Sequence, residues 1–442
     1  MRRHRGALIV IAAFLVGCGG ANSADPTTDV APTTTLPHAV NDEKSEPSPN
    51  DESGRESEIS AEPAAPTDVL PEPAVNSGGG TDPNSVSADF DFSAVDPLTA
   101  DFVDRNGLNG AALVVVHRDF GVIDERFWGV FDAERVSMIA SSSKMVAASV
   151  LLALDDAGQL DINAPIADAL PYAADHPDIT TAQLLSNSSG LPGLMATSKY
   201  PDYLCAFSHE GSLQECAEAI LTTPSDDDDV VAPDTRFDYG GVQWQVAGAV
   251  AEAASGMSWA ELVDQLIVQP CGLTNFAFNN PFSQIETAGF SHPPGFDNNP
   301  EVLVATANPN IEAGAYSTTT DYAALMQMHL RGGVCGDTTV LSQEALDVMH
   351  NDRIAEAYDG HAGSHVTGYG MGWWVDRMTG TISDQGAFGS VPILDLDDGY
   401  GMLLMTESSS GLAGTLADEL LPLIDEAVAA ALTQPTPSTS TG

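Results

Sequence analysis

A serine and a lysine stand one helical turn apart at the start of an apolar segment. Ser141 and Lys144 are followed by apolar residues that recur at every fourth position from Val146 to Leu154, and Gly158 then marks a stop. Residues i and i+3 lie on the same face of a helix, so this spacing predicts a hydroxyl and an amine within reach of one another. A buried amine without a partner is costly, so Lys144 would need a partner if the fold encloses it.

Lysine is rare in this chain, which makes its presence at this place informative. Only three lysines occur among 442 residues, and the other two, Lys44 and Lys199, lie in a low-complexity stretch and a predicted loop. A serine hydroxyl beside an amine base is a known way to activate a nucleophile. The alternative is that Ser141 only caps the helix, which is the commonest role of serine at a helix start.

The N-terminus predicts an exported lipoprotein. Residues 1–17 combine three arginines with an apolar stretch, residues 7–16, that is too short to span a bilayer, as in a signal peptide. The Leu-Val-Gly-Cys sequence that ends at Cys18 resembles the bacterial lipoprotein box, in which the cysteine becomes the acylated first residue. Acylation would anchor the protein to the bacterial cell membrane or cell envelope. An ordinary signal peptide with a chance cysteine is the alternative.

Composition separates one folded region from two flanking segments. Residues 18–94 are rich in Pro, Thr, Ser, Asp, Glu and Gly. Such a segment cannot bury enough apolar surface to fold, so we expect a disordered tether. Residues 433–442 form a similar tail. Residues 95–432 remain, and they are enough for one large domain or two closely packed ones.

Charge and cysteine content limit the possible partners. The formal net charge of −48 argues against a nucleic-acid partner, because the protein would repel phosphates. Export implies an oxidising compartment, and the four cysteines after Cys18 fit two disulfides in any of three pairings. We favour Cys205–Cys216, which closes a short loop, together with Cys271–Cys335. No spacing resembles a metal site, and no cofactor is expected.

The predicted elements place strands at both ends of this region and helices between them. A hairpin is expected over residues 111–117 and 122–131, and strand character returns at 369–376 and over 386–405. Helices are expected at residues 242–254, 259–268, 322–331 and 412–432. This order predicts a sheet built from residues 95–144 and 341–432, with residues 145–340 as a mostly helical part.

A series of short motifs resembles the family of class C β-lactamases, D-alanyl-D-alanine peptidases and related esterases. The matches follow one order along residues 95–432: Ser141 to Lys144 with its helix, Leu185 to Pro192, Phe237 to Tyr239, Gln269 to Asn275, Ala313 to Ala323 and Gly368 to Trp373. The resemblance implies an α+β, β-lactamase/transpeptidase-like fold. Such a fold has an antiparallel sheet flanked by terminal helices and a mostly helical second subdomain.

The resemblance and the residue chemistry together imply three catalytic roles. Ser141 would be the nucleophile, Lys144 would accept or relay its proton, and Tyr239 would be a second general acid/base. The pKa of Tyr239, ordinarily about 10, must then fall, and a cationic Lys144 would push it down. The backbone N–H groups of Ser141 and Ala387 would form an oxyanion hole. Alternatively, Tyr239 is an ordinary core tyrosine.

The chain departs from the family pattern at two motifs. The family's Tyr-x-Asn reads Tyr239-Gly240-Gly241 here, so the asparagine that would help to fix Lys144 is missing. The family's third motif carries a cation that assists binding of the substrate carboxylate, whereas this chain offers Asp384, Gln385 and Gly386. We expect an aspartate there to repel such a carboxylate.

These features predict an exported, lipid-anchored and monomeric serine hydrolase that acts through a covalent acyl-enzyme at Ser141. The missing cation favours a neutral carboxylic ester as the small-molecule substrate. A β-lactamase or D-alanyl-D-alanine carboxypeptidase, which would cleave an amide, is one alternative. The other is a non-catalytic envelope-binding protein on a decayed hydrolase scaffold.

Overall fold

The computed structural model describes residues 88–194, 197–224, 229–287, 290–354 and 366–433. The expected signal peptide, the anchor at Cys18 and most of the expected tether therefore lie outside the described residues, as does nearly all of the tail. Phe92, which was assigned to the tether, is only 3% exposed and packs into the core. The folded domain thus begins slightly before residue 95.

The centre of the domain is a seven-stranded antiparallel sheet with the strand order β2-β1-β12-β11-β10-β9-β8. Leu113 near the N-terminal end of the domain pairs with Leu404 near its C-terminal end. The predicted sheet of sequence-distant segments is confirmed. The strands are β1 (Gly110–His117), β2 (Gly121–Gly129), β8 (Thr367–Tyr369), β9 (Trp374–Asp376), β10 (Ile382–Ser383), β11 (Ser390–Asp395) and β12 (Tyr400–Met405).

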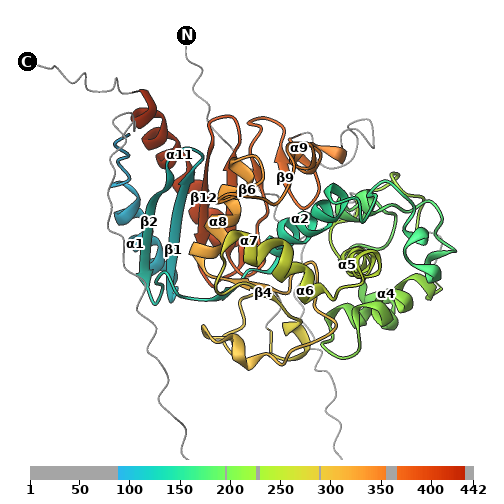
Figure 1. The fold of residues 1–442 in the computed structure, drawn as a ribbon. Helices are drawn as coiled ribbons and strands as arrows, with labels where there is room; N and C mark the ends of the chain where they lie inside the picture. The colour runs from blue at the N-terminus through green and yellow to red at the C-terminus, as the bar shows by residue number, and fades with distance from the viewer. Residues whose placement is uncertain (1–87, 195–196, 225–228, 288–289, 355–365, 434–442) are drawn as a thin grey trace, which may run out of the picture. The chain divides into compact units, whose positions relative to one another are not determined.

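Helices cover both faces of this sheet (Figure 1). Every residue of β1 is buried, because alternate side chains of a strand enter opposite layers. Leu113 and Val115 pack with the terminal helices α1 (Val95–Asn106) and α11 (Ser410–Thr433). Val114 and Val116 belong to the main core, which also contains α2 (Ser143–Asp156) and α8 (Thr319–Leu330). The predicted α+β class with flanking terminal helices is confirmed.

The helical part surrounds α5, which is buried from Val242 to Ala251 and contacts α2, α3, α4 and α6 (Figure 1). One expectation about its extent is wrong. Helix α8 lies within residues 145–340 but packs against β1 and β12, so it belongs to the sheet layers. The helices concerned are α3 (Thr181–Leu185), α4 (Leu213–Thr222), α5 (Val242–Ser255) and α6 (Trp259–Val263), which continues through a π-helical turn (Asp264–Val268) into α7 (Gln269–Cys271).

The remaining elements are short. They are a three-stranded sheet of β3 (Ser137–Met138), β4 (Ala277–Phe278) and β5 (Ala315–Ser317), the β6 (Val334–Cys335) and β7 (Thr338–Thr339) pair, and α9 (Gln343–His350). The order of the small sheet is β3-β5-β4, so β5 lies in its middle. Along the chain, β3 ends directly before the turn that carries Ser141, so this sheet supports the turn.

The strand expected over residues 369–376 is instead a tight hairpin of β8 and β9, with Tyr369 opposite Trp374. Gly372 has a φ of +81°, a left-handed conformation that suits a residue without a side chain. A Cβ at Gly372 would lie 2.8 Å from the carbonyl oxygen of Lys144. The hairpin turn therefore packs directly against the first turn of α2, and a continuous strand would not fit there.

Both favoured disulfides are present. Cys205 pairs with Cys216 across 11 residues, and Cys271 pairs with Cys335 across 64 residues. The second bond joins the end of α7 to β6 and so ties the helical part to the α8 region. Among the described helices, none combines the length and the hydropathy that crossing a membrane requires.

Candidate active site

Ser141 lies in a tight turn that joins β3 to α2. Residues Ala140–Ser142 form one 3₁₀ turn and α2 begins at Ser143, so Ser141 precedes the helix. Ala140 has a φ of +46°, a strained conformation for a residue with a Cβ. Ser142 is the N-cap residue of α2, and no side-chain cap bond is present. The helix-cap alternative for Ser141 is therefore wrong.

Two serines fasten this turn to the segment between β10 and β11. Ser142 Oγ donates to the carbonyl oxygen of Asp384 at 2.5 Å, and Ser390 Oγ donates to that of Ile139 at 2.8 Å. Both side chains are buried. The strained backbone at Ala140, next to the nucleophile, is thus held by hydrogen bonds with residues 384–390, where the third motif is expected.

Lys144 is fully buried beneath the candidate nucleophile, with 0% of its surface exposed. Its Nζ donates to Ser141 Oγ at 3.2 Å and to the carbonyl oxygen of Glu312 at 3.1 Å, and it lies 3.2 Å from the Glu312 carboxylate. The amine also lies 4.8 Å from the centre of the Tyr239 ring and 5.7 Å from that of Trp244. The predicted contact between the hydroxyl and the amine is therefore present.

The charge state of Lys144 follows from its neighbours. Burial is the largest single influence and favours the neutral amine, but attraction to the ionised forms of Tyr239, Glu312 and Asp384 outweighs it. The pKa of Lys144 is therefore raised above its ordinary value of 10.5. The resting amine is a cation that is paired with a buried carboxylate, so it has to release a proton before it can act as a base.

Tyr239 adjoins this group, with its ring centre 4.8 Å from the Lys144 amine. Loss of solvent around its hydroxyl raises the pKa of Tyr239, although the Lys144 charge and the nearby Ser141 side chain act in the opposite direction. The expectation that this pKa falls is wrong, because desolvation is the larger effect. The resting tyrosine is neutral and can donate a proton. The core-tyrosine alternative does not account for its position beside Ser141 and Lys144.

The glycine pair after Tyr239 adopts a backbone that only glycine accepts easily. Gly241 has φ +80° and ψ −153°, and a Cβ there would lie 2.5 Å from the carbonyl carbon of Gly193. The Gly241 N–H donates to Glu312 Oε2 at 2.8 Å. Gly240 N–H donates to Asn187 Oδ1 at 3.0 Å. The loop therefore holds Tyr239 through backbone contacts, without the motif's asparagine side chain.

Asp384 does not face a substrate, contrary to the expectation that it repels a carboxylate there. Its side chain is fully buried and accepts a hydrogen bond from the Met145 N–H at 3.1 Å, beneath the first turn of α2. Burial raises the pKa of Asp384 to about 8, against the opposing charge of Lys144 and the bond from Met145. At neutral pH the group is largely protonated, so it adds little negative charge to the site.

The next two residues of this segment, Gln385 and Gly386, contact different parts of the fold. Gln385 Nε2 donates to the carbonyl oxygen of Ser410 at the start of α11, away from the nucleophile. A Cβ at Gly386 would lie 2.0 Å from the carbonyl oxygen of Ile139, so only glycine allows this close approach. The next residue, Ala387, is thereby brought to the side of the turn that holds Ser141.

The geometry leaves two amides available for an oxyanion. Within the described part of the chain, the N–H groups of Ser141 and Ala387 donate no backbone or side-chain hydrogen bond. Ala140 and Ala387 meet in one apolar cluster beside the turn. Two unused N–H groups on adjoining segments match the predicted oxyanion pair.

Aromatic rings pack around Tyr239. The Tyr239 and Trp374 rings stack at 5.0 Å, and Tyr369 meets both rings edge-on. The ring centres of Phe237 and Trp374 lie 5.8 Å apart. Phe237 and Trp374 are partly exposed, so this wall is open to a ligand at the outer end.

Sequence reasoning missed two residues that hold this site, Glu312 and Asn187. Asn187 Oδ1 accepts from both Gly240 N–H and the Trp244 indole N–H, and so supports the Tyr239 loop. Glu312 directly precedes the recognised Ala313-Gly314 pair. Two features of the sequence could have indicated this role for Glu312. An acidic residue directly precedes Ala313-Gly314, and the family's asparagine is replaced by Gly241.

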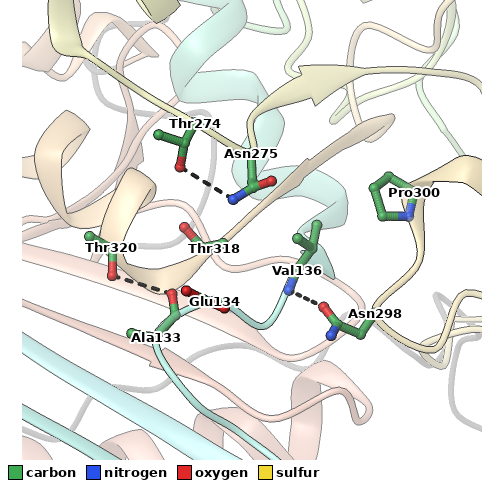
Figure 2. Close-up of a pocket in the computed structure, with 9 residues that line it drawn as sticks. All are labelled: Ala133, Glu134, Val136, Thr274, Asn275, Asn298, Pro300, Thr318 and Thr320. Carbon is green, nitrogen blue, oxygen red and sulfur yellow. Dashed lines mark hydrogen bonds between the residues drawn. The ribbon is translucent and has the colours of Figure 1, made fainter. Parts of the chain in front are cut away.

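A separate polar pocket of about 520 Å³ contains none of these residues. It lies beside β3 and the start of α8, where Val136 N–H donates to Asn298 Oδ1 (Figure 2). Its lining consists of Ala133, Glu134, Val136, Thr274, Asn275, Asn298, Pro300, Thr318 and Thr320. The candidate site at Ser141 is thus distinct from this pocket.

Comparison with known proteins agrees with the fold. A penicillin-binding protein homolog from Caulobacter crescentus superposes with a TM-score of 0.61 at 17% identity, covering 76% of this chain and 97% of that one. EstCE1, a hydrolase with promiscuous acyltransferase activity, superposes with a TM-score of 0.60 at 19% identity, covering 76% and 97%. Penicillin-binding protein 4 of Amycolatopsis lactamdurans is 26% identical over 335 residues, which cover 72% of this chain and 82% of that protein.

A family model gives the broadest match. The model described as beta-lactamase matches residues 95–423, which include Ser141, Tyr239, Glu312 and Asp384. This span is most of the folded domain. The chain therefore belongs to the beta-lactamase family of serine hydrolases.

Proposed function

We propose that this protein is a serine hydrolase that cleaves carboxylic esters through a covalent acyl-enzyme at Ser141. One observation carries the proposal: the fully buried Lys144 amine donates to Ser141 Oγ at 3.2 Å and lies 4.8 Å from the centre of the Tyr239 ring. A buried lysine held at a serine hydroxyl has a clear use in nucleophilic catalysis. As a purely structural feature it would be expensive.

The proposed reaction has two halves. Lys144 first loses its extra proton to solvent; Ser141 Oγ then attacks the ester carbonyl carbon while its proton passes to the neutral Lys144 amine, and the negative charge that develops on the carbonyl oxygen meets the Ser141 and Ala387 N–H groups. The bond to the alcohol oxygen then breaks, the neutral Tyr239 hydroxyl protonates the leaving alkoxide, and the Lys144 ammonium returns a proton to Tyr239. Water next attacks the acyl-enzyme, which releases the carboxylic acid and restores Ser141.

A neutral substrate suits the charges around the nucleophile. The segment Asp384 to Ala387 carries no cation, and its one acidic side chain is turned into the core. His292, whose ring contacts Phe388, is neutral near pH 7 because burial lowers its pKa to about 4.

Penicillin binding with D-alanyl-D-alanine peptidase or β-lactamase activity is the second candidate. It is favoured by the 26% identity to penicillin-binding protein 4 of Amycolatopsis lactamdurans. It requires a cation for the substrate carboxylate, and residues 382–390 of this chain contain no lysine, arginine or histidine. The ester hydrolase therefore accounts for more of the site.

The location and assembly remain proposals from the sequence. We propose export, acylation at Cys18 and attachment to the cell membrane or envelope as a monomer. Mass spectrometry of the protein from a bacterial host, with a Cys18→Ala variant as control, tests the lipid: a diacylglyceryl-sized mass addition is expected only with Cys18 present. An unmodified, soluble wild-type protein would contradict the anchor.

The test of the function is covalent labelling followed by turnover. The purified chain is treated with a fluorophosphonate, and the labelled peptide is located by mass spectrometry. We expect an adduct on Ser141 that Ser141→Ala abolishes and Lys144→Ala reduces at least 100-fold in rate, with p-nitrophenyl butyrate hydrolysed in preference to nitrocefin. A folded wild-type protein without an adduct would support the decayed-scaffold alternative, and preferred nitrocefin turnover would support the second candidate.

A further inference from the structure

We propose that Glu312 is the positioning residue that holds Lys144 against Ser141, in place of the asparagine that the second motif lacks. The proposal rests on the proposed serine hydrolase function and adds to it a residue that the motif pattern does not contain. It assigns to the region before Ala313-Gly314 a role in acylation. It also gives a physical reason for the Gly240-Gly241 pair.

Glu312 contacts the Lys144 amine through both its side chain and its backbone. Lys144 Nζ lies 3.2 Å from the Glu312 carboxylate and donates to the Glu312 carbonyl oxygen at 3.1 Å. Its remaining donated bond goes to Ser141 Oγ at 3.2 Å. An ammonium group has three N–H donors, and these three oxygens match that number. Replacing the Glu312 side chain removes the carboxylate contact, so only the Glu312 backbone carbonyl and Ser141 Oγ are left to orient the amine.

Burial makes this pair a requirement for a charged Lys144. The side chains of Lys144 and Glu312 are 0% and 4% exposed. A buried charge without a partner is strongly unfavourable. The other groups that face the amine are the Tyr239 hydroxyl and, without a hydrogen bond to it, Asp384. Because Asp384 is largely protonated at neutral pH, Glu312 is the carboxylate that is left to balance the lysine.

The glycine pair and Glu312 fit one another. Gly241 N–H donates to Glu312 Oε2 at 2.8 Å, and a Cβ at Gly240 would lie only 2.6 Å from the same oxygen. The carboxylate thus occupies the space that a side chain on this loop would fill. The missing asparagine and the acidic residue before Ala313 are therefore two parts of one substitution. A decayed motif would leave Lys144 without such a partner.

The carboxylate also sets the proton affinity of the amine. Negative charge at Glu312 raises the pKa of Lys144, so a variant without that charge has a lower lysine pKa. Acylation needs the neutral amine, and its fraction rises as pH passes through the lysine pKa. Removing the charge therefore moves the acid limb of the kcat/KM profile to lower pH.

Glu312→Gln in the full-length chain tests both effects, with p-nitrophenyl butyrate as substrate. We expect the pH-independent limit of kcat/KM, above the acid limb, to fall about 10- to 100-fold, because the amine loses its fixed direction. We also expect the acid limb to shift to lower pH. Asp425→Asn is the control, since it removes a carboxylate that bonds Tyr400 on the other face of the sheet. It should leave the rate and the pH profile unchanged.

Two further variants keep the test decisive if Glu312→Gln fails to fold. Gly240→Ala leaves both charges in the chain but pushes the Glu312 carboxylate away, so it should also lower kcat/KM at least 10-fold. Gly241→Asn restores the family's Tyr-x-Asn motif in the sequence. It should nevertheless lose activity, because its Cβ would lie 2.5 Å from the carbonyl carbon of Gly193.

Full activity and an unshifted acid limb in Glu312→Gln would overturn the positioning role, as would a gain of activity in Gly241→Asn. Either result leaves the proposed function intact if wild-type Ser141 still takes the fluorophosphonate. Absence of that adduct in the folded wild-type protein is a different failure, because it removes the proposed function on which this inference depends.

Discussion

Two carboxylates lie beneath the candidate nucleophile, and their surroundings give them different roles. Glu312 contacts the Lys144 amine directly and forms an ion pair with it. Asp384 bonds only the Met145 N–H, and one of its oxygens has no hydrogen-bond partner among the described residues. The same side-chain chemistry therefore supports a fixed negative charge at one position and a neutral acid at the other.

The raised pKa of Asp384 predicts a pH-dependent cost to stability. The folded pKa is about 8 against an ordinary value of 3.8, so the folded state holds this proton more tightly than the unfolded state. Stability contributed by the neutral acid is complete below about pH 4 and is lost as pH rises toward about 8. Asp384→Asn keeps an acceptor for the Met145 N–H and removes the ionisation. At pH 5 we expect the free energy of unfolding of the variant to be equal to or lower than that of the wild type. At pH 8.5 we expect the variant to be the more stable protein.

Urea unfolding at these two pH values measures the effect. The informative quantity is the difference between the variant and the wild type, since other groups titrate equally in both. If the two stability curves run parallel from pH 5 to pH 8.5, Asp384 is not a neutral acid in the folded protein.

At the scale of elements, a buried ion pair joins the ends of three strands. Arg135, just before β3, makes two hydrogen bonds to Glu407, just after β12, at 2.9 and 2.7 Å. Glu407 also accepts from Ser137 in β3 and from Asn109 at the start of β1. Glu407 has a φ of +35°, which is unusual for this residue type. The pair thus keeps β3, and with it the nucleophile turn, in register with the main sheet.

Breaking this pair should be costly. Arg135→Met leaves Glu407 buried and unpaired, so we expect a loss of about 3–5 kcal/mol in the free energy of unfolding. Arg135→Met with Glu407→Leu should recover much of that loss. The control is Arg105→Met, which breaks a pair with Glu419 whose side chains are 49% and 40% exposed, and it should cost less than about 1 kcal/mol.

Chemical denaturation of the three variants decides between a buried and a superficial role. A loss in Arg135→Met no larger than that in Arg105→Met would mean that the strand ends are held by other contacts. The pH dependence gives a second check. The Glu407 pKa is lowered in the fold because its partners outweigh burial, so its stabilisation is present at neutral pH and is lost as pH falls below about 4.5.

At the scale of the whole molecule, the two disulfides constrain very different lengths of chain. Cys205–Cys216 spans 11 residues and Cys271–Cys335 spans 64. A cross-link limits the unfolded chain more when it closes a longer loop. On this account the first bond stabilises the fold by about 3 kcal/mol and the second by about 4 kcal/mol.

Removal of each pair by alanine substitution tests this ranking. We expect both double-alanine variants to be less stable than the wild type in guanidinium unfolding, with the larger loss for Cys271 and Cys335. A larger loss for Cys205 and Cys216 would show that local packing, and not the length of the closed loop, sets the stabilisation.

Local patterns in the sequence were enough to predict most elements and three members of the candidate site. The helix after Ser141, the first hairpin, α5 and α11 follow from periodicity and turn residues, which depend only on neighbours along the chain. The Ser141–Lys144 contact is also local, since the two residues are three positions apart. The four cysteines, taken with their spacing, led to the observed pairing.

The tertiary structure determined what depends on burial and on distant contacts. Glu312 meets Lys144 across 168 residues, and Met145 meets Asp384 across 239, so no local pattern could reveal either contact. The split of residues 367–376 into a hairpin depends on how closely Gly372 approaches α2. The raised pKa values of Tyr239 and Asp384 depend on exclusion of water. Sequence by itself thus determined which groups are present and which are neighbours along a helix, whereas only the fold decided which are buried, and therefore which are charged, because desolvation is a property of the whole enclosure.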